Sequence, residues 1–447
     1  MTDRTVIVGG GITGLAAAHE LHTQGREFVV LEADPRAGGK IAGGPMAGVA
    51  FDVDMAADGF LAREPEMTDL CVELGLGDSL TSPRPGGAFL WVDGALRRIP
   101  PGVLGAPLDP DVVADAGIVS DAGVAALRAA LAADLPALDG DATVGEVLRP
   151  RVGDEVFERM VDPLLGGINA GNADEMSIRT GAAALANAAS KGGPFIDALR
   201  THVAAATPGP VFHGIEGGSQ RIIDALTYEI GDRLHVGEAV FDIEPTGGSW
   251  TVRTDDAAYD ADRVILTTPG WISASLLAPY APEAAAVLAG LQYSDAVLVT
   301  FVAQRDQLGH ELDGAGFLVP RGQDLLMTAT SVSSYKWAHY DDGEHVVLRV
   351  SAGRTDDRRW VDMPIDDVVT HLRSELEITI GLTGDVTHRV SEWPRCLPQY
   401  RAGHLDRCDQ IDEWLARDTP GITVAGASMR GLGLPACVRQ GRSAASR

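Results

Sequence analysis

Three glycines and one carboxylate near the start of the chain stand at a spacing that suits the binding of phosphate and sugar. Gly9, Gly11 and Gly14 form the pattern Gly-x-Gly-x-x-Gly between the β-branched residues 5–8 and an Ala- and Leu-rich helix former. Such glycines permit a tight turn, let the backbone approach a pyrophosphate and allow a helix to pack closely on a strand. Glu32 ends the next hydrophobic run, where a carboxylate accepts hydrogen bonds from ribose hydroxyls and disfavours NADP. The pattern predicts a dinucleotide site, and the alternative is a glycine-rich turn in an ordinary βαβ unit.

A second group of glycines follows the predicted ribose site and decides which dinucleotide we expect. Arg36, Gly38, Gly39 and Lys40 lie just after the second strand. Paired glycines leave backbone amides free to meet a phosphate or the ribityl chain of a flavin, and Arg36 can supply positive charge on the adenosine side. We therefore expect FAD rather than NAD, with a flexible exposed turn as the alternative.

Later segments return to the same kind of patterning and supply further candidates for cofactor contact. A strand over residues 263–268 ends in small residues before a proline, which suggests backbone lying against the cofactor. Near the C-terminus, a strand over residues 421–427 leads through residues 431–435 into a helix and gives a second set of amides. The residues of these later segments that we expect to contact the cofactor are Val240, Thr267, Gly426, Gly433 and Leu434.

The middle of the chain does not continue the dinucleotide pattern. Asp93-Gly94 between two hydrophobic runs predicts a β-hairpin. Residues 101–210 are typical of helices, and the strands predicted at 293–305, 315–320, 325–332 and 345–352 would form an antiparallel sheet. The predicted fold class is α/β with α+β insertions: a Rossmann-like FAD-binding domain, an antiparallel-sheet substrate domain and a helical lobe. We place the FAD-binding domain at residues 1–80, 212–272 and 394–447, the substrate domain at 81–100 and 273–393, and the helical lobe at 101–211.

The overall charge and composition narrow the function classes. The net charge of −27 disfavours nucleic acid and anionic lipid as partners, and an acidic substrate would have to be held by local basic residues. The four cysteines are scattered without metal-ligand spacing, so we expect buried, reduced thiols and no metal site. There is no secretory leader pattern and no run of 18 apolar residues, which predicts a cytoplasmic protein without a transmembrane segment.

Several motifs resemble those of flavin-dependent protoporphyrinogen/coproporphyrinogen oxidases, a family within the monoamine-oxidase-like flavoproteins. The resemblance covers nearly the whole chain. The N-terminal fingerprint and residues 36–40 are common to the superfamily, whereas other segments are more specific to the family. The more specific segments are residues 58–61, 163–171, 217–218, 335–337, 393–400, 403–404 and 431–437.

The resemblance implies an oxidase of heme biosynthesis. Members of the family remove six electrons from a porphyrinogen in three two-electron steps, with FAD as cofactor, O2 as acceptor and H2O2 as by-product. The soluble type from Gram-positive bacteria, which converts coproporphyrinogen III to coproporphyrin III, is the closer analogue, and a ferrochelatase is a candidate partner. Such a mechanism needs no nucleophile, metal or triad. We assign no catalytic residue, since none of the 11 histidines is a convincing candidate.

The same resemblance directs attention to groups that could hold the substrate. Coproporphyrinogen carries four propionates, so arginines near the pocket-forming segments should matter, with solvent-exposed arginines as the alternative for each. The apolar, glycine-punctuated segment 163–171 is expected to form a loop that lines a pocket for a flat ligand, with a structural connector as the alternative. The residues that we expect to contact the substrate are Arg63, Arg97, Arg98, Gly167 and Ile168.

Two departures from the family pattern keep other functions open. Ala436 stands where the family usually has Asp, and the chain stops at Arg447, which leaves the closing helix short and would weaken flavin retention. The alternatives are a protoporphyrinogen IX oxidase, an amine oxidase and a non-catalytic FAD- or porphyrin-binding protein. An amine oxidase should have an aromatic cage around the flavin and often a Cys that tethers it, whereas aromatic residues make up only 5% of this chain.

Overall fold

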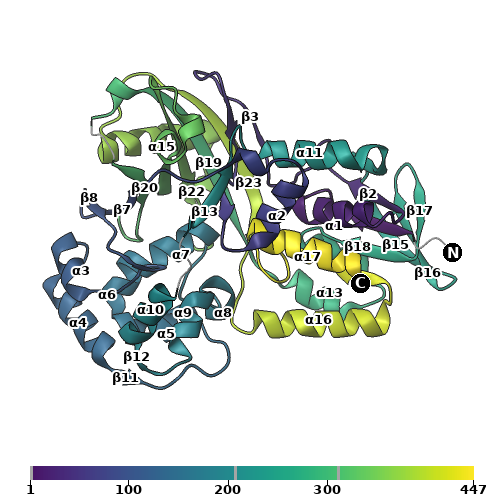
Figure 1. Ribbon diagram of the computed structural model, residues 1–447, viewed down its shortest axis with the longest axis horizontal. Coiled ribbons are helices and arrows are strands. Elements are labelled where there is room, and N and C mark those ends of the chain that lie inside the picture. The colour runs from purple at the N-terminus through teal and green to yellow at the C-terminus, as the bar shows by residue number, and fades with distance from the viewer. Residues whose placement is uncertain (1–3, 206–208, 310–312) are drawn as a thin grey trace.

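The first strand, helix and second strand form where the glycine pattern predicts them. β1 (Thr5–Val8) is buried along its whole length and leads through the glycine turn into α1 (Ile12–Thr23). β2 (Phe28–Glu32) pairs in parallel with β1. β-branched residues suit β1 because both faces of the sheet are covered. The structure is a computed structural model, and the parts of the chain that it describes are residues 4–205, 209–309 and 313–447 (Figure 1).

Five parallel strands form one sheet from segments that lie far apart in the sequence. Their order is β14-β2-β1-β18-β24, so the first two strands of the chain lie in the middle. Because strands from the start, middle and end of the chain share this sheet, the dinucleotide fold is discontinuous, as predicted. The three added strands are β14 (Leu234–Val236), β18 (Arg263–Leu266) and β24 (Ile422–Val424).

Helices cover both faces of the parallel sheet. Ile7, Val30 and Ile265 point to one face and share an apolar cluster with its helices, whereas Val6 and Val264 belong to the cluster on the other face. The three layers confirm the predicted Rossmann-like arrangement, and Figure 1 shows α1 and α17 packed side by side. The first face carries α1, α11 (Gln220–Ile230) and α17 (Leu434–Ser446), and the second carries α12 (Gly270–Leu277), α13 (Pro282–Ala289) and α16 (His404–Asp418).

A second sheet of seven strands has the order β23-β19-β22-β21-β20-β7-β8. Its neighbours are antiparallel except β20 and β7, and α15 (Ile365–Ile380) packs on one face. The predicted hairpin is present, since Asp93 (φ 51°) and Gly94 (φ 79°) both adopt the left-handed conformation that a two-residue hairpin turn needs. The strands are β7 (Gly87–Val92), β8 (Ala95–Arg98), β19 (Tyr293–Gln304), β20 (Gly314–Leu318), β21 (Met327–Val332), β22 (His345–Ala352) and β23 (Thr387–Pro398).

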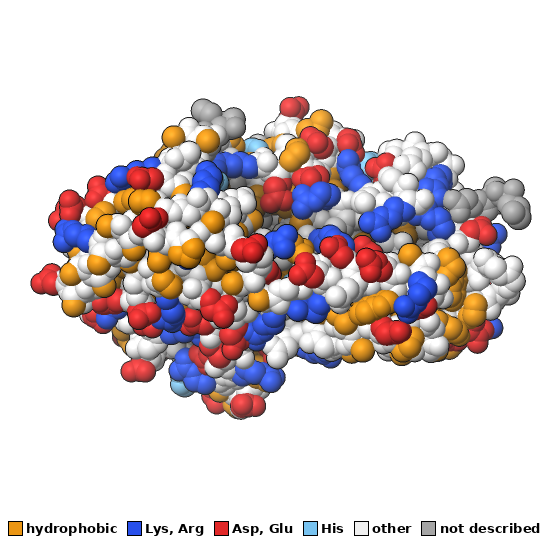
Figure 2. All heavy atoms as spheres, turned by 90° about the horizontal axis from the view of Figure 1, so that it is seen from below, with side chains coloured by type: hydrophobic (Ala, Val, Ile, Leu, Met, Phe, Trp, Pro, Cys, Tyr) orange, Lys and Arg blue, Asp and Glu red, His pale blue; other side chains and the backbone are white. Residues whose placement is uncertain are grey.

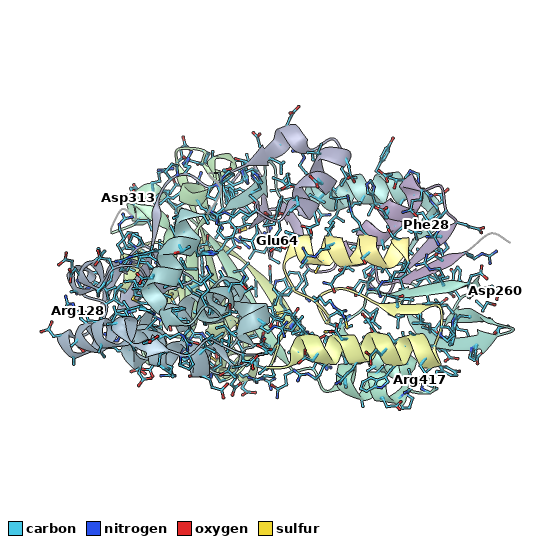
Figure 3. All side chains as sticks on the ribbon, turned by 60° about the horizontal axis from the view of Figure 1, so that its bottom comes forward. Phe28, Glu64, Arg128, Asp260, Asp313 and Arg417 are labelled. Atoms are coloured by element: carbon cyan, nitrogen blue, oxygen red, sulfur yellow. The ribbon has the colours of Figure 1, made fainter. Side chains whose placement is uncertain are left out.

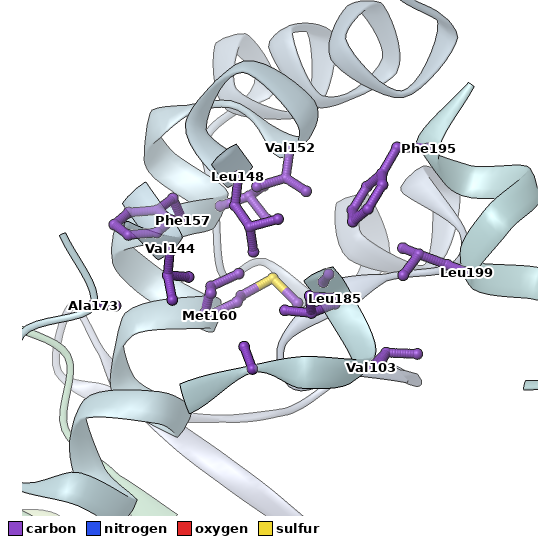
Figure 4. Close-up of a cluster of buried hydrophobic side chains, with 14 of the residues drawn as sticks. Val103, Val144, Leu148, Val152, Phe157, Met160, Ala173, Leu185, Phe195 and Leu199 are labelled. Atoms are coloured by element: carbon purple, nitrogen blue, oxygen red, sulfur yellow. The ribbon is translucent and has the colours of Figure 1, made fainter. Parts of the chain in front are cut away.

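The helical lobe has an apolar core of its own. Figure 4 shows its buried side chains, among them Leu148, Phe157, Met160 and Leu185, converging between short helices. The helical reading of this region is confirmed, while the limits that we predicted for the three domains stay a prediction. The helices are α3 (Pro110–Ala116), α4 (Asp121–Ala132), α5 (Val144–Val152), α6 (Asp154–Val156), α7 (Asp162–Asn169), α8 (Ile178–Gly181), α9 (Ala183–Ala189) and α10 (Phe195–Ala204).

The prediction of a loop at residues 163–171 is wrong, because most of this segment forms helix α7. Its glycines permit close packing rather than a turn. A Cβ on Gly166 would lie 2.9 Å from the carbonyl oxygen of Gly171, and a Cβ on Gly167 would lie 3.3 Å from Leu318 of β20. Glycine within a short apolar stretch therefore marked a crowded helix in this lobe, not an irregular connection.

A buried ionic cluster fixes the N-terminal region to the seven-stranded sheet. Asp58 accepts hydrogen bonds from Lys336 Nζ (3.0 Å) and Trp337 Nε1 (3.1 Å) and pairs with Arg349 at 2.9 Å. Burial alone would raise the pKa of Asp58, but Lys336 and Arg349 lower it overall. Lys336, from the family-like segment 335–337, thus has a structural role through its bond to Asp58.

The expectations drawn from composition concern the cysteine thiols, membrane-spanning helices and metal sites. All four cysteines are buried and free, as predicted. Within residues 4–205, 209–309 and 313–447, no helix has the length and apolar character needed to cross a bilayer. In the same parts of the chain, no group of three His, Cys, Asp or Glu side chains could hold a metal ion.

Candidate cofactor and substrate site

Four of the predicted cofactor residues lie together at the carboxyl-terminal edge of the parallel sheet. Gly9 directly follows β1, Glu32 ends β2, Thr267 follows β18 and Gly426 lies two residues beyond β24. Because these strands are parallel and adjacent, residues distant in sequence meet at one edge. In open α/β sheets this edge is where ligands bind.

The glycine turn after β1 is built so that only glycine fits at two positions. Gly9 has φ +106°, and a Cβ on it would lie 2.8 Å from Thr267 Oγ1. A Cβ on Gly14 would lie 1.9 Å from the carbonyl oxygen of Gly9. Gly11 differs, because it has an ordinary φ of −72° and a Cβ there would meet no described heavy atom within 4 Å. The open space at Gly11 is what the close approach of a pyrophosphate requires.

Glu32 is held in place by backbone amides. Its Oε2 accepts a hydrogen bond from the amide of Gly10 (2.6 Å), and its Oε1 accepts one from the amide of Asp34 (2.8 Å). A carboxylate has about four acceptor sites, so both oxygens retain capacity for ribose hydroxyls. The predicted ribose-binding carboxylate is therefore fixed beside the N-terminus of α1.

The loop after β2 is closed by its own arginine. Arg36 donates to the carbonyl oxygen of Gly39 (2.6 Å) and to two further carbonyls of the same loop. The amide of Gly38 donates to the carbonyl of Gly10 (2.8 Å), which ties this loop to the glycine turn. These bonds hold a defined loop, in place of the flexible turn that was the alternative. We call residues 9–11, 14, 32, 38 and 39 the cradle.

Lys40 directly follows the glycine pair of the cradle. Its side chain is exposed, yet the surrounding protein lowers the pKa of its ammonium group, and the thiols of Cys396 and Cys437 act in the opposite direction. The segments 393–400 and 431–437, which carried part of the family resemblance, thus reach the cradle through these two cysteines.

Two predicted cofactor residues, Thr267 and Val240, lie next to the cradle. Thr267 Oγ1 donates to the carbonyl oxygens of Gly9 (2.9 Å) and of the residue before it (3.0 Å), so it holds the glycine turn. Val240 begins β15 (Val240–Thr246), and the amide of Glu238, two residues earlier, donates to the carbonyl of Glu32 (2.8 Å). Val240 is therefore close to the ribose-binding end of the site.

The C-terminal helix places a second helix N-terminus beside the first. Gly433 caps α17 in an extended conformation and Leu434 is its first residue. Seven residues into α17, a Cβ on Gly441 would lie 2.2 Å from the carbonyl oxygen of Thr13, so the two helices touch backbone to backbone. Helix N-termini favour negative charge, and two of them suit a pyrophosphate.

Gln440 was not singled out from the sequence, although it shapes the loop between β24 and α17. Its Oε1 accepts from the amides of Arg430 (3.0 Å) and Gly426 (3.3 Å), and its Nε2 donates to the carbonyl of Gly431 (3.3 Å). One amide side chain therefore fixes the loop at three points. Its role was hidden because a glutamine on a helix has no motif of its own.

Two aromatic residues bind backbone carbonyls of the same loop. His404 Nε2 donates to the carbonyl of Met429 (2.5 Å), and Tyr400 OH donates to the carbonyl of Ala427 (2.6 Å). Their rings stack with centroids 4.3 Å apart. Burial lowers the pKa of His404 to about 4, so the neutral ring makes this contact at neutral pH. Tyr400 and His404, which end the family-like segments 393–400 and 403–404, thus hold the backbone of this loop in place.

The arrangement fits the adenosine diphosphate part of a dinucleotide. Free space at Gly11, an anchored carboxylate at Glu32 and two helix N-termini each match one part of such a ligand. The fit rests on cradle geometry that only glycine permits, which an ordinary βαβ turn would not need.

The predicted substrate arginines are not gathered at the cradle. Arg63 is exposed in the loop before α2 (Pro65–Glu73). This loop is close to α17, because Arg439 of α17 bonds Glu64 (3.3 Å) and Glu66 (2.8 Å) at the start of α2. Figure 3 shows Glu64 at the beginning of the C-terminal helix. Arg63 is therefore on the side of the molecule that holds the parallel sheet.

Arg97 and Arg98 lie on β8, the edge strand farthest from β23. Both are exposed, and Arg98 pairs with Asp313 (3.0 Å) and lies over the ring of Phe89 (4.9 Å). In Figure 3, Asp313 and Phe28 of β2 lie toward opposite ends of the molecule. The structure therefore places these two arginines away from the cradle.

Gly167 and Ile168 lie on α7 where it approaches the seven-stranded sheet. Ile168 is 59% exposed, which is unusual for an isoleucine in a short helix with a buried face. The next residue, Asn169, accepts a hydrogen bond at its carbonyl from Gln399 Nε2 (2.9 Å). The exposed apolar end of α7 is thus joined to the end of the 393–400 segment.

Fold and cradle together define a flavin-dependent oxidoreductase. The chain belongs to the family described as flavin containing amine oxidoreductase, whose model matches residues 12–447. This family confirms the predicted flavin, and the dinucleotide geometry makes that flavin FAD.

Particular relatives are similar along almost the whole chain. A coproporphyrinogen III oxidase of Bacillus subtilis (strain 168) is 30% identical over 99% of this chain and 97% of its own length. One from Mycobacterium leprae is 32% identical over 98% and 96%. A crystal structure from Exiguobacterium sp. 255-15, provisionally assigned as a protoporphyrinogen oxidase, has a TM-score of 0.90 at 30% identity and covers 100% of this chain and 98% of that one. Cyclohexylamine oxidase from Brevibacterium oxydans has a TM-score of 0.74 at 18% identity and shares the fold.

Proposed function

We propose that this chain is an FAD-dependent oxidase that converts coproporphyrinogen III to coproporphyrin III, a reaction of heme biosynthesis. The observation that carries the proposal is the similarity, along nearly the whole length, to coproporphyrinogen III oxidases from two bacteria. The cradle supports it, because oxidation of a reduced macrocycle needs an electron acceptor held in a fixed position.

The reaction removes six hydrogen atoms from the macrocycle, as six electrons and six protons, and three O2 would receive them as three H2O2. Bound FAD supplies an acceptor for two electrons at a time. The residues of the chain bind and orient. The glycine turn and Glu32 would fix the adenosine diphosphate end, and Gln440 and His404 hold the backbone loop before α17. No proton transfer is assigned to a side chain.

The proposed contacts follow the sequence predictions. Among the arginines Arg98 is the weakest candidate, because its guanidinium is already paired with Asp313. We propose as cofactor contacts Gly9, Gly11, Gly14, Glu32, Arg36, Gly38, Gly39, Lys40, Val240, Thr267, Gly426, Gly433 and Leu434, and as substrate contacts Arg63, Arg97, Arg98, Gly167 and Ile168.

A second candidate is oxidation of protoporphyrinogen IX. A chloroplastic protoporphyrinogen oxidase of Oryza sativa is 25% identical over 99% of this chain and 87% of its own length. The two substrates differ in carboxylate number, so the arginines around the site should decide between them. An amine oxidase has less support, because its structural relatives here are below 20% identity.

The test is aerobic oxidation of both porphyrinogens, side by side, by purified FAD-loaded protein. We expect porphyrin fluorescence to rise faster than the non-enzymatic rate with coproporphyrinogen III, with three H2O2 formed per porphyrin. Acceleration with protoporphyrinogen IX alone would replace the first proposal by the second. No acceleration with either substrate would overturn both.

Two accompanying predictions concern the surroundings of the reaction. We propose a cytoplasmic location, supported by four buried, reduced thiols, and a ferrochelatase as a partner that would receive the product. Co-purification of the two proteins at cellular concentrations would support this partner. Separate migration at those concentrations would contradict it.

A further inference from the structure

A strained arginine interrupts β23 within the segment 393–400. Arg395 has φ +46°, a conformation that costs a non-glycine residue roughly 1–2 kcal/mol. The pairing with β19 shifts register at this point, between Ser294 and Ala296. The amide of Arg395 donates to Asp295 Oδ1 (2.8 Å), the residue at the shift. A bulge of this kind re-aims a side chain, and here it is held by a specific hydrogen bond.

The guanidinium of Arg395 rests on a rigid aromatic platform. Its central carbon lies 3.8 Å from the ring centroid of Trp271, at the start of α12. Trp271 packs edge-on against Tyr293, with centroids 4.6 Å apart. Tyr293 OH accepts from the amide of Gly270 (2.9 Å) and shares a hydrogen bond with Ser428 (3.0 Å). Both rings are thereby fixed, and the guanidinium keeps the N–H donors along its edge available.

Arg395 has no acidic partner among the residues that the structure describes. Both oxygens of the nearby carboxylate of Asp295 have other partners. Oδ1 accepts a hydrogen bond from the backbone amide of Arg395, and Oδ2 pairs with Arg358 (3.1 Å). No described carboxylate lies within 4.0 Å of the guanidinium, although the side chain is exposed. Because the chain has a net charge of −27, an arginine that is held in a fixed orientation without a carboxylate partner stands out from its acidic surroundings. Figure 2 shows acidic and basic side chains interspersed over one face of the molecule, so positive charge acts locally.

The position of Arg395 connects the cradle to α7. The next residue, Cys396, interacts electrostatically with Lys40, which directly follows Gly39 of the cradle. Gln399, four residues after Arg395, bonds the carbonyl of Asn169 at the end of α7. Tyr293, under the platform, reaches Ser428 in the loop before α17. The exposed guanidinium of Arg395 therefore belongs to a segment whose neighbouring residues contact Lys40, α7 and the loop before α17.

We propose that Arg395 binds a carboxylate of the substrate and so orients the macrocycle beside the cradle. A guanidinium that presents its edge can hold a carboxylate by two parallel hydrogen bonds. This inference rests on the proposed function and deepens it, because it names the group that offsets repulsion between an acidic protein and a tetracarboxylate. β8 lies six strand spacings from β23, about 29 Å across the sheet at about 4.8 Å per strand. Arg97 and Arg98 cannot serve the same carboxylate as Arg395.

The test measures binding separately from turnover. FAD-loaded wild type and variants are titrated with coproporphyrin III and with its tetramethyl ester, in which every carboxylate is blocked. In R395A we expect the dissociation constant for coproporphyrin III to rise about tenfold, equal to about 1.4 kcal/mol. Affinity for the ester should not change. R395K keeps the charge but loses the two-pronged geometry, so its affinity should lie in between.

Two further variants serve as controls. R395G accepts the left-handed backbone without strain and also removes the guanidinium, so it should match R395A even if R395A folds poorly. R417A removes an exposed arginine of α16 that is paired with Glu283 and Asp418, and it should bind as wild type does. In turnover assays KM for coproporphyrinogen III should rise with little change in kcat.

Unchanged affinity in both R395A and R395G would overturn the proposal, and so would equal weakening for acid and ester. Wild-type protein that binds no coproporphyrin III would also overturn it. Failure of the proposed function looks different, because porphyrinogen oxidation would be absent in wild type while the binding titration still reports on Arg395.

Discussion

The cradle and the face around Arg395 achieve binding geometry in opposite ways. In the cradle, residues within one βαβ unit shape the backbone, and glycines at positions 9 and 14 are required because a Cβ would strike neighbouring atoms. Around Arg395, side chains from α12, β19 and β23 converge, and the backbone strain lies on a non-glycine residue. Binding geometry that is set by the backbone of neighbouring residues leaves a recognisable sequence pattern. Binding geometry that is set by side chains from distant segments leaves none.

The largest effect should come from Gly14, where the cradle is most crowded. In Gly14→Ala the new Cβ would lie 1.9 Å from the carbonyl oxygen of Gly9, so the turn has to move. We expect a loss of about 3 kcal/mol in unfolding free energy and loss of bound flavin. Gly290→Ala is the matched control, since Gly290 has φ −75° and its nearest contacts would be 3.4–3.5 Å. Denaturant unfolding that finds both variants equally stable would show that the turn is not as crowded as described.

The next effect concerns the support beneath the loop before α17 and depends on pH. The folded pKa of His404 is lowered to about 4 from its ordinary 6.5, so the unfolded chain binds the proton first as pH falls. Stability from the neutral ring is therefore full above pH 6.5 and declines between pH 6.5 and 4. The loss should reach about 2 kcal/mol by pH 5.

His404→Gln keeps a donor for Met429 but does not titrate, so unfolding free energy should fall less steeply over the same pH range. His371→Gln, on the exposed side of α15, is the control and should follow wild type. A His404→Gln curve parallel to that of wild type would contradict the assignment of the pH dependence to His404.

The smallest effect is expected at the far edge of the seven-stranded sheet. Arg98 is half-exposed and paired with Asp313, which is 92% exposed, and such surface ion pairs contribute about 0–1 kcal/mol. Arg98→Ala should therefore change KM for coproporphyrinogen III by less than about twofold, as measured in steady-state assays. A rise as large as that of R395A would show that Arg98 contributes as much to substrate binding as Arg395 and would weaken the contrast between the two regions.

Much of the fold could be predicted because its signals are local. The β1–α1–β2 unit followed from the glycine spacing, and the β7–β8 hairpin followed from Asp93-Gly94. The segment 163–171 was misread because glycine in a helix and glycine in a loop look alike until the neighbours of Gly166 are known. The packing of Gly167 against Leu318 of β20 is a tertiary contact that no local pattern contains.

The candidate site was predictable only where backbone carries the function. Glu32 and the glycines were placed correctly at the sheet edge, yet the roles of Gln440 and His404 depend on partners up to 25 residues away. Arg395 lies in the family-like segment 393–400, which the sequence analysis identified without singling out this residue. The orientation of its guanidinium depends on Trp271 and its lack of an acidic partner depends on Asp295, and both residues are at least 100 positions away.

The central claim is that the cradle leaves room at Gly11 for the phosphates of FAD, and Gly11→Ala tests it most directly. Because a Cβ at this position meets no described atom within 4 Å, the FAD-free variant should melt within about 2 °C of wild type. Its affinity for FAD, measured by titration of the FAD-free protein, should fall about tenfold or more. A variant that binds FAD as tightly as wild type would contradict the account.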